Sequence, residues 1–308
     1  MFKILLNGIF ILYQHTRFVL VVAFLVLYQF ANFSAWAESK PEPTTSLQEI
    51  IEFALDINSK GLSINNSLPS EDVTFLVKKY YYQIQTKLEQ LATAKEVRGH
   101  FQKAVKKSEE SFEQEDGVIS RSDITKLKLG LSDILGNIVD LEYDLQIARL
   151  DLGKLINQEL KPDSNIGKVD PSPIKFVYNS FEEFLRAKKF SSTTKKQKAD
   201  IAISFNRESV RLNEANELIL YKAYIAVQTS NIKMTIGKNN RKITRALLIT
   251  EAANYDFGIG DSEELFEALI IYTRVFSSYL DSIYTFNLAV ANLEKLNDST
   301  HRSIDRLN

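Results

Sequence analysis

The sequence NYDFGIGDSEEL, residues 254–265, places two glycines and several acids between two long stretches of helix-forming residues. Glycine readily adopts the positive φ that ends a helix, and Asp, Ser or Glu then caps the start of the next helix. A similar break, FEQEDGVISRSDI, occupies residues 112–124. Each break therefore predicts the tip of a hairpin made of two long antiparallel helices.

The two tips belong to an internal duplication. Both halves have the same order of elements: a short helix, a long helix, a glycine-containing tip and a returning long helix. The short helices also match, SLQEIIEFA in the first half against SFEEFLRAK in the second. In the long helices, equivalent residues are separated by 143 positions before the tip and by 141 after it, which makes Glu115 and Asp116 a two-residue insertion. The aligned pairs are Tyr81 with Tyr224, Phe112 with Tyr255, and Gly117 with Gly258.

The expected fold is all-α, with two tandem helical hairpins and little or no β-sheet. The first repeat spans residues 46–160, with helices expected at 46–58, 70–114 and from Ser120 or Ser122 to 158; Ser46 and Glu49 form a capping box. The second repeat spans 180–297, with helices at 180–187, 194–257 and 262–296. Residues 38–45 and 161–179 are expected linkers, and 298–308 a polar tail. Residues 221–236 are rich in β-branched side chains, so a β-hairpin is an alternative to helix there.

The long segments carry apolar residues at spacings of three and four, as coiled-coil-like partners require. In residues 70–114 these are Leu88, Leu91, Val97, Phe101, Ala104 and Val105. In the returning helix they are Ile124, Leu127, Leu131, Leu135, Ile138, Leu141, Leu145, Ala148, Leu152 and Leu155. Helices of this length favour a rod, a bundle or a barrel of helices.

The N-terminus has the pattern of a signal peptide, residues 1–37. An apolar core, FVLVVAFLVL at 18–27, follows the basic residues Lys3 and Arg17, and Ala35 and Ala37 are small residues suited to signal peptidase. We expect cleavage after Ala37; an uncleaved N-terminal anchor is the alternative. In either case the rest of the chain is exported.

Composition argues against several classes of function. The net charge of −1 offers no basic face for nucleic acid, and the absence of Cys removes disulfides, thiolate nucleophiles and Cys-based metal sites. The three histidines are far apart in sequence, and we find no phosphate-binding loop, catalytic triad or metal-ligand spacing. We therefore expect no enzyme activity, no catalytic residue, no metal and no cofactor.

The duplicated pattern resembles the TolC-like outer-membrane efflux proteins. The resemblance rests on AANYDFGIGDSEELFEA followed by YLDSIYTFNLAVANL at 279–293, and on GVISRSDITKLKLGL followed by DLEYDLQIARLDLGKLI in the first repeat. The openings SLQEIIEFALDIN and SFEEFLRA are similar to the family's S-L-E-E-A. The resemblance covers most of residues 46–297.

The resemblance implies a trimer whose hairpins form a periplasmic tunnel. In that family the tips form an aperture and meet a periplasmic adaptor that joins an inner-membrane pump, and two strands per repeat pass through the outer membrane. Residues 61–72 are the only stretch of the first repeat where such strands would lie, so we expect the membrane strands to be missing. By position, the tip residues are Gly117, Arg121, Asp123, Gly258, Gly260, Asp261 and Glu263.

Several of these residues also have a plain structural explanation. The tip residues serve as turn and cap residues in any hairpin. Helical tyrosines, namely Tyr81, Tyr143, Tyr224, Tyr255, Tyr272, Tyr279 and Tyr284, are expected to pack between helices. Two lysine clusters, Lys103, Lys106 and Lys107, and Lys195, Lys196 and Lys198, are expected to lie on solvated faces.

The predicted function is a component of an efflux or type I secretion conduit, in the periplasm or associated with the outer membrane. The alternative is a soluble periplasmic scaffold or binding protein that keeps the hairpins but conducts nothing.

Overall fold

The computed structural model describes residues 46–61, 68–113, 120–189 and 207–305, all within the compact unit Thr45–Asn308. The predicted signal peptide and first linker, the tip residue Gly117, the insertion at Glu115 and Asp116, and the second lysine cluster lie outside the described residues. The described part of the chain forms α-helices and contains no β-strand, which confirms the predicted fold class.

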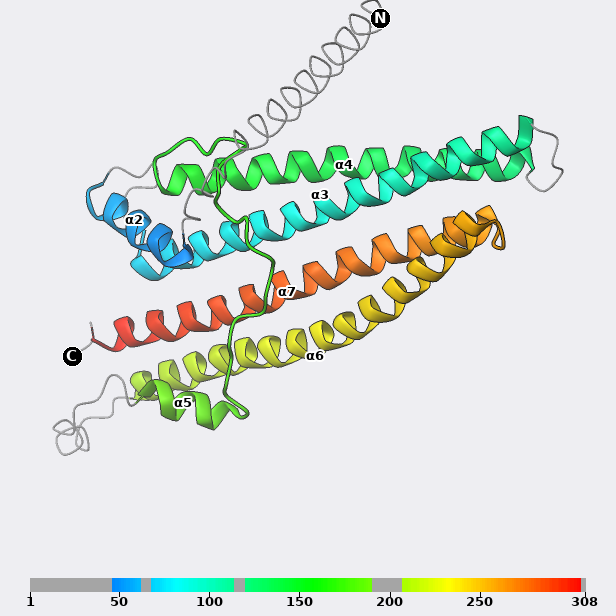
Figure 1. The fold of residues 1–308 in the computed structure, drawn as a ribbon. Coiled ribbons are helices and arrows are strands. Elements are labelled where there is room, and N and C mark those ends of the chain that lie inside the picture. The colour runs from blue at the N-terminus through cyan, green and yellow to red at the C-terminus, as the bar shows by residue number, and fades with distance from the viewer. Residues whose placement is uncertain (1–45, 62–67, 114–119, 190–206, 306–308) are drawn as a thin grey trace, which may run out of the picture. The chain divides into compact units, whose positions relative to one another are not determined.

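The helices follow the predicted order in both repeats (Figure 1). They are α2 (Leu47–Ser59), α3 (Ser70–Glu113), α4 (Arg121–Leu155), α5 (Phe181–Lys189), α6 (Arg207–Phe257) and α7 (Ser262–Asp305). Residues 221–236 lie inside α6, so the β-hairpin alternative is wrong. Helix α7 continues nine residues beyond the predicted end at 296, since no Gly or Pro interrupts the sequence there.

Local capping explains where the helices begin. The hydroxyl of Ser46 accepts a hydrogen bond from the Glu49 amide at 3.2 Å, and the Glu49 carboxylate accepts one from the Ser46 amide at 2.7 Å. Ser120, rather than Ser122, caps α4 in the same reciprocal way with Asp123. Each pair satisfies two amides that the first helical turn leaves unbonded.

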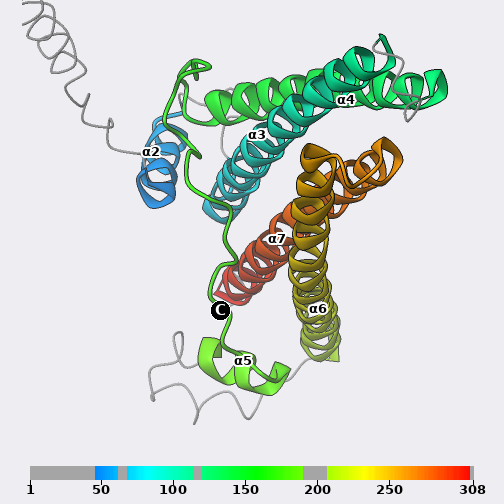
Figure 2. The same cartoon turned by 45° about the vertical axis from the view of Figure 1, so that its right-hand side comes forward.

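Two helical hairpins lie side by side, with α3 and α7 in the middle and α4 and α6 at the two edges (Figures 1 and 2). Helix α3 packs extensively on both α4 and α7. Helix α6 packs extensively on only one long helix, α7. The short helices cover the ends: α2 packs on α3, and α5 packs its Phe181 and Phe184 against α6 and α7. The two edge helices consequently keep large uncovered surfaces.

The predicted apolar stripe of α4 is largely correct. Most of its members are buried against α3, but Leu135 is 43% exposed and lies off the core face. Gly130 and Ile134 take part in the buried face instead. The core positions of α4 recur every seven residues, at 127, 134, 141, 148 and 155 and at 124, 131, 138, 145 and 152. Leu135 lies one residue after the core position 134 and therefore points away from the core.

The segment between the repeats is held against both of them. The Gln85 amide donates to the Val169 carbonyl at 3.3 Å. Buried Asn287 of α7 both accepts from the Ile174 amide and donates to the Ser172 carbonyl, each at 2.9 Å. The predicted linker 161–179 is therefore tied to α3 and α7 by side-chain hydrogen bonds.

Polar contacts also join α3 to α7 within their apolar interface. Gln90, 4% exposed, donates through its side-chain amide to the Ser277 hydroxyl and to the Asp281 carboxylate, both at 2.8 Å. Such bonds fix the register between the repeats, since a shift along the helices would leave the buried amide unpaired.

None of the helices in the described ranges combines the length and the apolar character that crossing a lipid bilayer requires.

Candidate functional site

The tip of the second repeat ends α6 in a Schellman motif. Gly258 has φ of +74°, and its amide donates to the Tyr255 carbonyl at 3.2 Å. The Ile259 amide donates to the Asn254 carbonyl at 3.0 Å, which completes the pair of bonds typical of this motif. Gly258 therefore has the predicted role of ending the helix.

Gly260 and Asp261 complete the turn in different ways. A Cβ at Gly260 would lie 2.8 Å from the Asn254 Cβ, so this position needs glycine for space rather than for a positive φ. The Asp261 carboxylate accepts from the Glu264 amide at 2.8 Å and so caps α7. Glu263 and Glu264 lie in the first turn of α7, where their negative charges interact favourably with the positive end of the helix dipole.

Two exposed apolar side chains at this tip were missed from the sequence. Phe257 and Ile259 flank Gly258 and are 81% and 78% exposed. The sequence feature that could have identified them is the presence of two large apolar residues in a turn, where polar residues are usual. Together with Asp261 and Glu263, they give the tip an apolar end beside acidic groups.

At the first tip, the described residues have structural partners. Asp123 forms the capping box with Ser120, and the hydrogen bond from the Ser120 hydroxyl lowers the pKa of this carboxyl. The exposed guanidinium of Arg121 lies 5.9 Å from the centre of the Phe112 ring. The cap explanation for Asp123 is thus supported by its geometry.

The two tips are connected through side chains of both repeats. Lys126 of α4 forms an ion pair with Glu263 of α7 at 2.8 Å, and this hydrogen bond raises the pKa of the lysine. The structure therefore brings predicted Glu263 to Lys126, a residue that the sequence reasoning did not identify. Because both side chains are exposed, the pair contributes little to stability.

A buried contact behind the tips links α3 to the end of α6. The Lys107 ammonium donates to the carbonyls of Tyr255 and Asp256, at 2.5 and 3.2 Å. The Tyr255 hydroxyl donates to the Ala104 carbonyl at 3.1 Å and lies 2.9 Å from the Ser108 hydroxyl. The expectation that Lys107 lies on a solvated face is wrong, because its ammonium occupies the carbonyl end of α6.

Most of the helical tyrosines pack as predicted, with one exception. Tyr81, Tyr224, Tyr255, Tyr272 and Tyr279 are buried, and Tyr284 packs against the main core. Tyr143 is 62% exposed, so the prediction that it packs between helices of this chain is wrong. It projects from the outer face of α4, since the core of that helix is formed by the opposite face.

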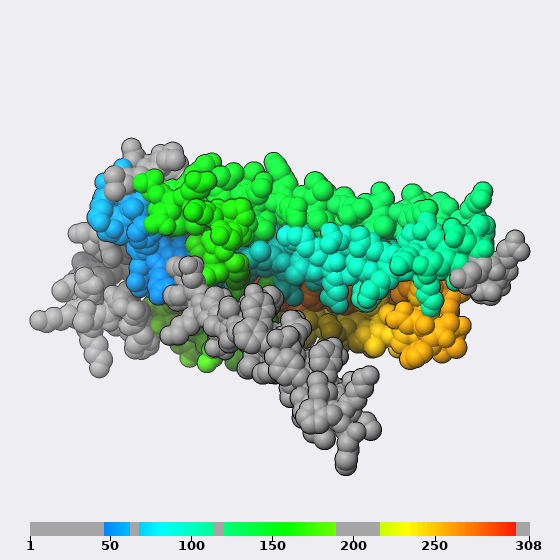
Figure 3. All heavy atoms as spheres, turned by 45° about the horizontal axis from the view of Figure 1, so that its top comes forward, coloured from blue at the N-terminus to red at the C-terminus, as the bar shows by residue number. Residues whose placement is uncertain are grey.

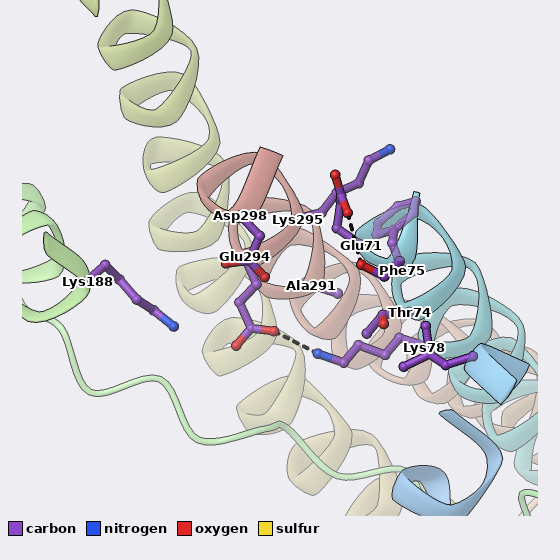
Figure 4. Close-up of a pocket in the computed structure, with 11 residues that line it drawn as sticks. Glu71, Thr74, Phe75, Lys78, Lys188, Ala291, Glu294, Lys295 and Asp298 are labelled. Carbon is purple, nitrogen blue, oxygen red and sulfur yellow. Dashed lines mark hydrogen bonds and ion pairs between the residues drawn. The ribbon is translucent and has the colours of Figure 1, made fainter. Parts of the chain in front are cut away.

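At the end of the bundle away from the tips, a cavity of about 270 Å³ lies between the two repeats (Figure 4). Lys78 pairs with Glu294 at 2.7 Å across it. Its lining contains three lysines and three carboxylates, so it offers no net charge to a ligand. The charged residues are Lys78, Lys188, Lys295, Glu71, Glu294 and Asp298.

Neither a protein-family model nor a curated protein matches the sequence. Solved structures do match at the level of fold. The outer-membrane channel OprN is 12% identical with a TM-score of 0.53, covering 82% of this chain and 70% of that chain. The transmembrane channel protein CusC is 12% identical with a TM-score of 0.53, covering 82% of this chain and 72% of that chain.

The outer membrane protein VceC from Vibrio cholerae is 9% identical with a TM-score of 0.52, covering 82% of this chain and 75% of that chain. The order and duplication of the hairpins led to the same family from the sequence. The chain therefore has the helical-hairpin fold of the TolC-like outer-membrane channels.

Proposed function

We propose that several copies of this chain associate side by side into the periplasmic tunnel of an efflux or type I secretion assembly. The number of copies is three by the resemblance, which gives twelve long helices. The tips, with Gly117, Arg121, Asp123, Gly258, Gly260, Asp261 and Glu263, form the aperture and meet a periplasmic adaptor and its inner-membrane pump. The observation that carries this proposal is the pair of uncovered apolar surfaces on the edge helices.

The first surface, the α4 edge, lies opposite the core face of α4. Helix α4 runs along one side of the molecule with this surface open (Figure 3). Its large side chains are between 37% and 65% exposed, although each is apolar or aromatic. They are Leu129, Leu135, Val139, Tyr143, Ile147 and Leu150.

The second surface, the α6 edge, is a narrow apolar stripe. At about 100° per residue its members fall within roughly 80° around the helix axis. They are between 38% and 68% exposed: Leu218, Tyr221, Ile225, Ile232, Ile236, Ile243 and Leu247. A continuous stripe of exposed apolar side chains marks an interaction site.

The charges beside the two edges are opposite in sign. Residues 129–148 of α4 contain four acids and no Lys or Arg: Asp133, Asp140, Glu142 and Asp144. Residues 218–250 of α6 contain six basic residues and no acid: Lys222, Lys233, Lys238, Arg241, Lys242 and Arg245. Glu142 and Asp144 already pair with Lys95 and Lys87 of α3, and Arg241 lies over aromatic rings of α7. The charges left for a neighbouring copy, such as Asp133 and Asp140 on α4 and Lys238 and Lys242 on α6, are still opposite in sign and favour contact between the α4 edge of one copy and the α6 edge of the next.

The acidic and basic residues also lie at similar distances along their helices from the tips. Asp133 and Asp140 follow Arg121, the first residue of α4, by 12 and 19 residues. Lys238 precedes Phe257, the last residue of α6, by 19 residues. Parallel copies would therefore bring the acidic and basic stretches together. Because the two edges differ, the contact is head-to-tail, and such a contact closes into a ring when the rotation between copies divides a full turn.

A charge-swap experiment tests the association. Changing Asp133 and Asp140 to Lys should weaken the oligomer measured by sedimentation velocity and crosslinking, and adding Lys238→Glu and Lys242→Glu should restore it. Glu52→Lys on α2 is the control, since Glu52 is exposed away from both edges. A monomer at high concentration in the wild type, or an oligomer indifferent to the swap, would contradict the proposal.

Transport is tested separately in cells. Deletion of the protein should increase susceptibility to dyes or antibiotics, and Asp261→Arg at the tip should reproduce part of this effect. Carbonate extraction of membranes measures whether the chain is integral or peripheral. An oligomer without any change in susceptibility on deletion would favour the alternative, a periplasmic scaffold that conducts nothing.

A further inference from the structure

Arg149 of α4 carries a buried charge without a counter-ion. The residue is 7% exposed, its Nε–H has no hydrogen-bond acceptor, and no carboxylate of the described residues forms an ion pair with it. Burial lowers the pKa of its guanidinium, and the negative charge of Asp163 opposes this shift without forming an ion pair with Arg149. An unpaired buried charge is unfavourable, so an anionic partner would stabilise the folded chain.

The guanidinium lines a cavity of about 340 Å³ at the end of α4. The helix ends with Asn157 at φ of +49°, and the Gln158 amide donates to the Gly153 carbonyl at 3.0 Å. A Cβ at Gly153 would lie 2.5 Å from the Gln158 carbonyl oxygen, so glycine permits this close return of the chain. The turn at 157–160 thereby forms the second wall of the cavity.

The lining of this cavity is cationic. Arg149 and Lys154 contribute two positive charges, and Glu159 contributes one negative charge without pairing to either. The exposed Lys154 also forms an ion pair with Asp151 at 3.8 Å, so a ligand would share this ammonium with Asp151. The negative end of the α4 dipole weakens anion binding here, but a desolvated guanidinium interacts with an oxyanion more strongly than a helix end does.

We propose that this cavity binds a small oxyanion, a carboxylate or a phosphate group, on Arg149 with Lys154 as the second contact. The planar guanidinium presents paired N–H donors that match two oxygens of either group. A neighbouring copy is a poor source of the anion, because the stretch of α6 proposed to face α4 contains no acid. The ligand is therefore a free anion.

The test is the melting temperature of the purified full chain in sodium phosphate, sodium acetate and sodium chloride at equal ionic strength. We expect phosphate or acetate to raise the melting temperature by about 2 to 4 °C relative to chloride. The phosphate and acetate arms distinguish a phosphate from a carboxylate ligand. Titration calorimetry of inorganic phosphate and of acetate into the wild type measures binding directly.

Arg149→Met should abolish this anion-specific shift and raise the melting temperature in chloride, because it removes the unpaired charge and keeps a similar volume. Arg149→Gln is a second variant for the same comparison. Arg274→Met, at an exposed position on α7, should keep the wild-type shift. The proposal is overturned if neither anion exceeds chloride in the wild type, or if the Arg149 variants keep the shift.

Discussion

The two glycines of the second tip differ in what they contribute. Gly258 supplies a positive φ that allows both Schellman bonds, and Gly260 leaves room for the Asn254 side chain. Both are required within three residues, because the chain must end one helix and begin the next almost at once. The sharpness of this tip follows from these two residues.

Gly258→Ala should lower the free energy of unfolding by about 1 kcal/mol, since an L-residue is strained at a φ of +74°. Gly99→Ala in α3 is the matched control: a Cβ there meets nothing within 4 Å, and alanine favours helix. The control should stabilise the protein by about 0.5 to 1 kcal/mol. Urea denaturation measures both, and two changes of equal sign would contradict the assignment.

Tyr82 illustrates the effect of burial on a single ionisable group. Its side chain is 6% exposed, and burial, reinforced by the charge of Glu294, raises its pKa from 10.0 to about 12. The folded state therefore favours the neutral phenol. Its contribution to stability is complete below pH 10 and is lost as the pH rises through about 12.

Tyr82→Phe should consequently reduce the loss of stability between pH 10 and 12 by about 2 to 3 kcal/mol. At pH 7 the variant should differ little from wild type, because the phenol is neutral in both states. Chemical denaturation at a series of pH values gives the difference, and ultraviolet absorbance follows tyrosinate formation. An unchanged alkaline profile in the variant would show that Tyr82 does not titrate as proposed.

At the scale of elements, the end of α6 is held by α3 of the other repeat. Lys107 bonds the last carbonyls of α6, and the Tyr255 hydroxyl is enclosed by Ser108 and the Ala104 carbonyl. Ser108 is fully buried, so removal of its partner leaves its hydroxyl without a replacement from water. The two hairpins are thus fastened to each other directly behind their tips.

Tyr255→Phe should destabilise the protein by about 1 to 2 kcal/mol through loss of these bonds. Tyr143→Phe is the control, because that hydroxyl belongs to an exposed side chain and its removal should change stability little. Hydrogen exchange should show faster opening at the end of α6 in the first variant only. Equal stability of the two variants would mean that the buried hydroxyl contributes nothing.

At the scale of the whole molecule, four long helices form a layer with two unlike edges. The middle helices α3 and α7 bury their apolar faces against each other and against the outer helices. Helices α4 and α6 keep apolar stripes that nothing in the described part of the chain covers. Association of copies would bury these stripes, at roughly 25 cal/mol for each square ångström removed from water. The proposed conduit depends on this burial rather than on any single residue.

Ile232→Lys in the centre of the α6 edge should dissociate the oligomer without unfolding the chain, since Ile232 is 61% exposed. Val177→Lys is the control, because Val177 is 52% exposed in the connecting segment and off both edges. Sedimentation velocity gives the molecular mass, and circular dichroism verifies the helix content. An oligomer that survives Ile232→Lys would exclude the α6 edge as the interface.

Local patterns in the sequence determined the helices, their caps and the duplicated tips. Ser46 with Glu49, and Gly258 followed by Asp261, act over three or four residues, so the sequence contains all that these contacts require. The repeat itself was visible because equivalent residues of the long helices keep a constant separation on each side of the tip. The prediction of helix rather than strand was correct even for residues 221–236, where β-branched residues are frequent.

Only the tertiary structure decided which partner each side chain meets. The pairing of Lys126 with Glu263, the capping of α6 by Lys107 and the isolation of Arg149 join or separate residues far apart in sequence. An apolar stripe at helical spacing looks the same whether its partner is in the same chain or in another copy. Tyr143 and the α6 edge were distinguishable from core only once the neighbours of α4 and α6 were known, because burial is a property of the packed neighbours.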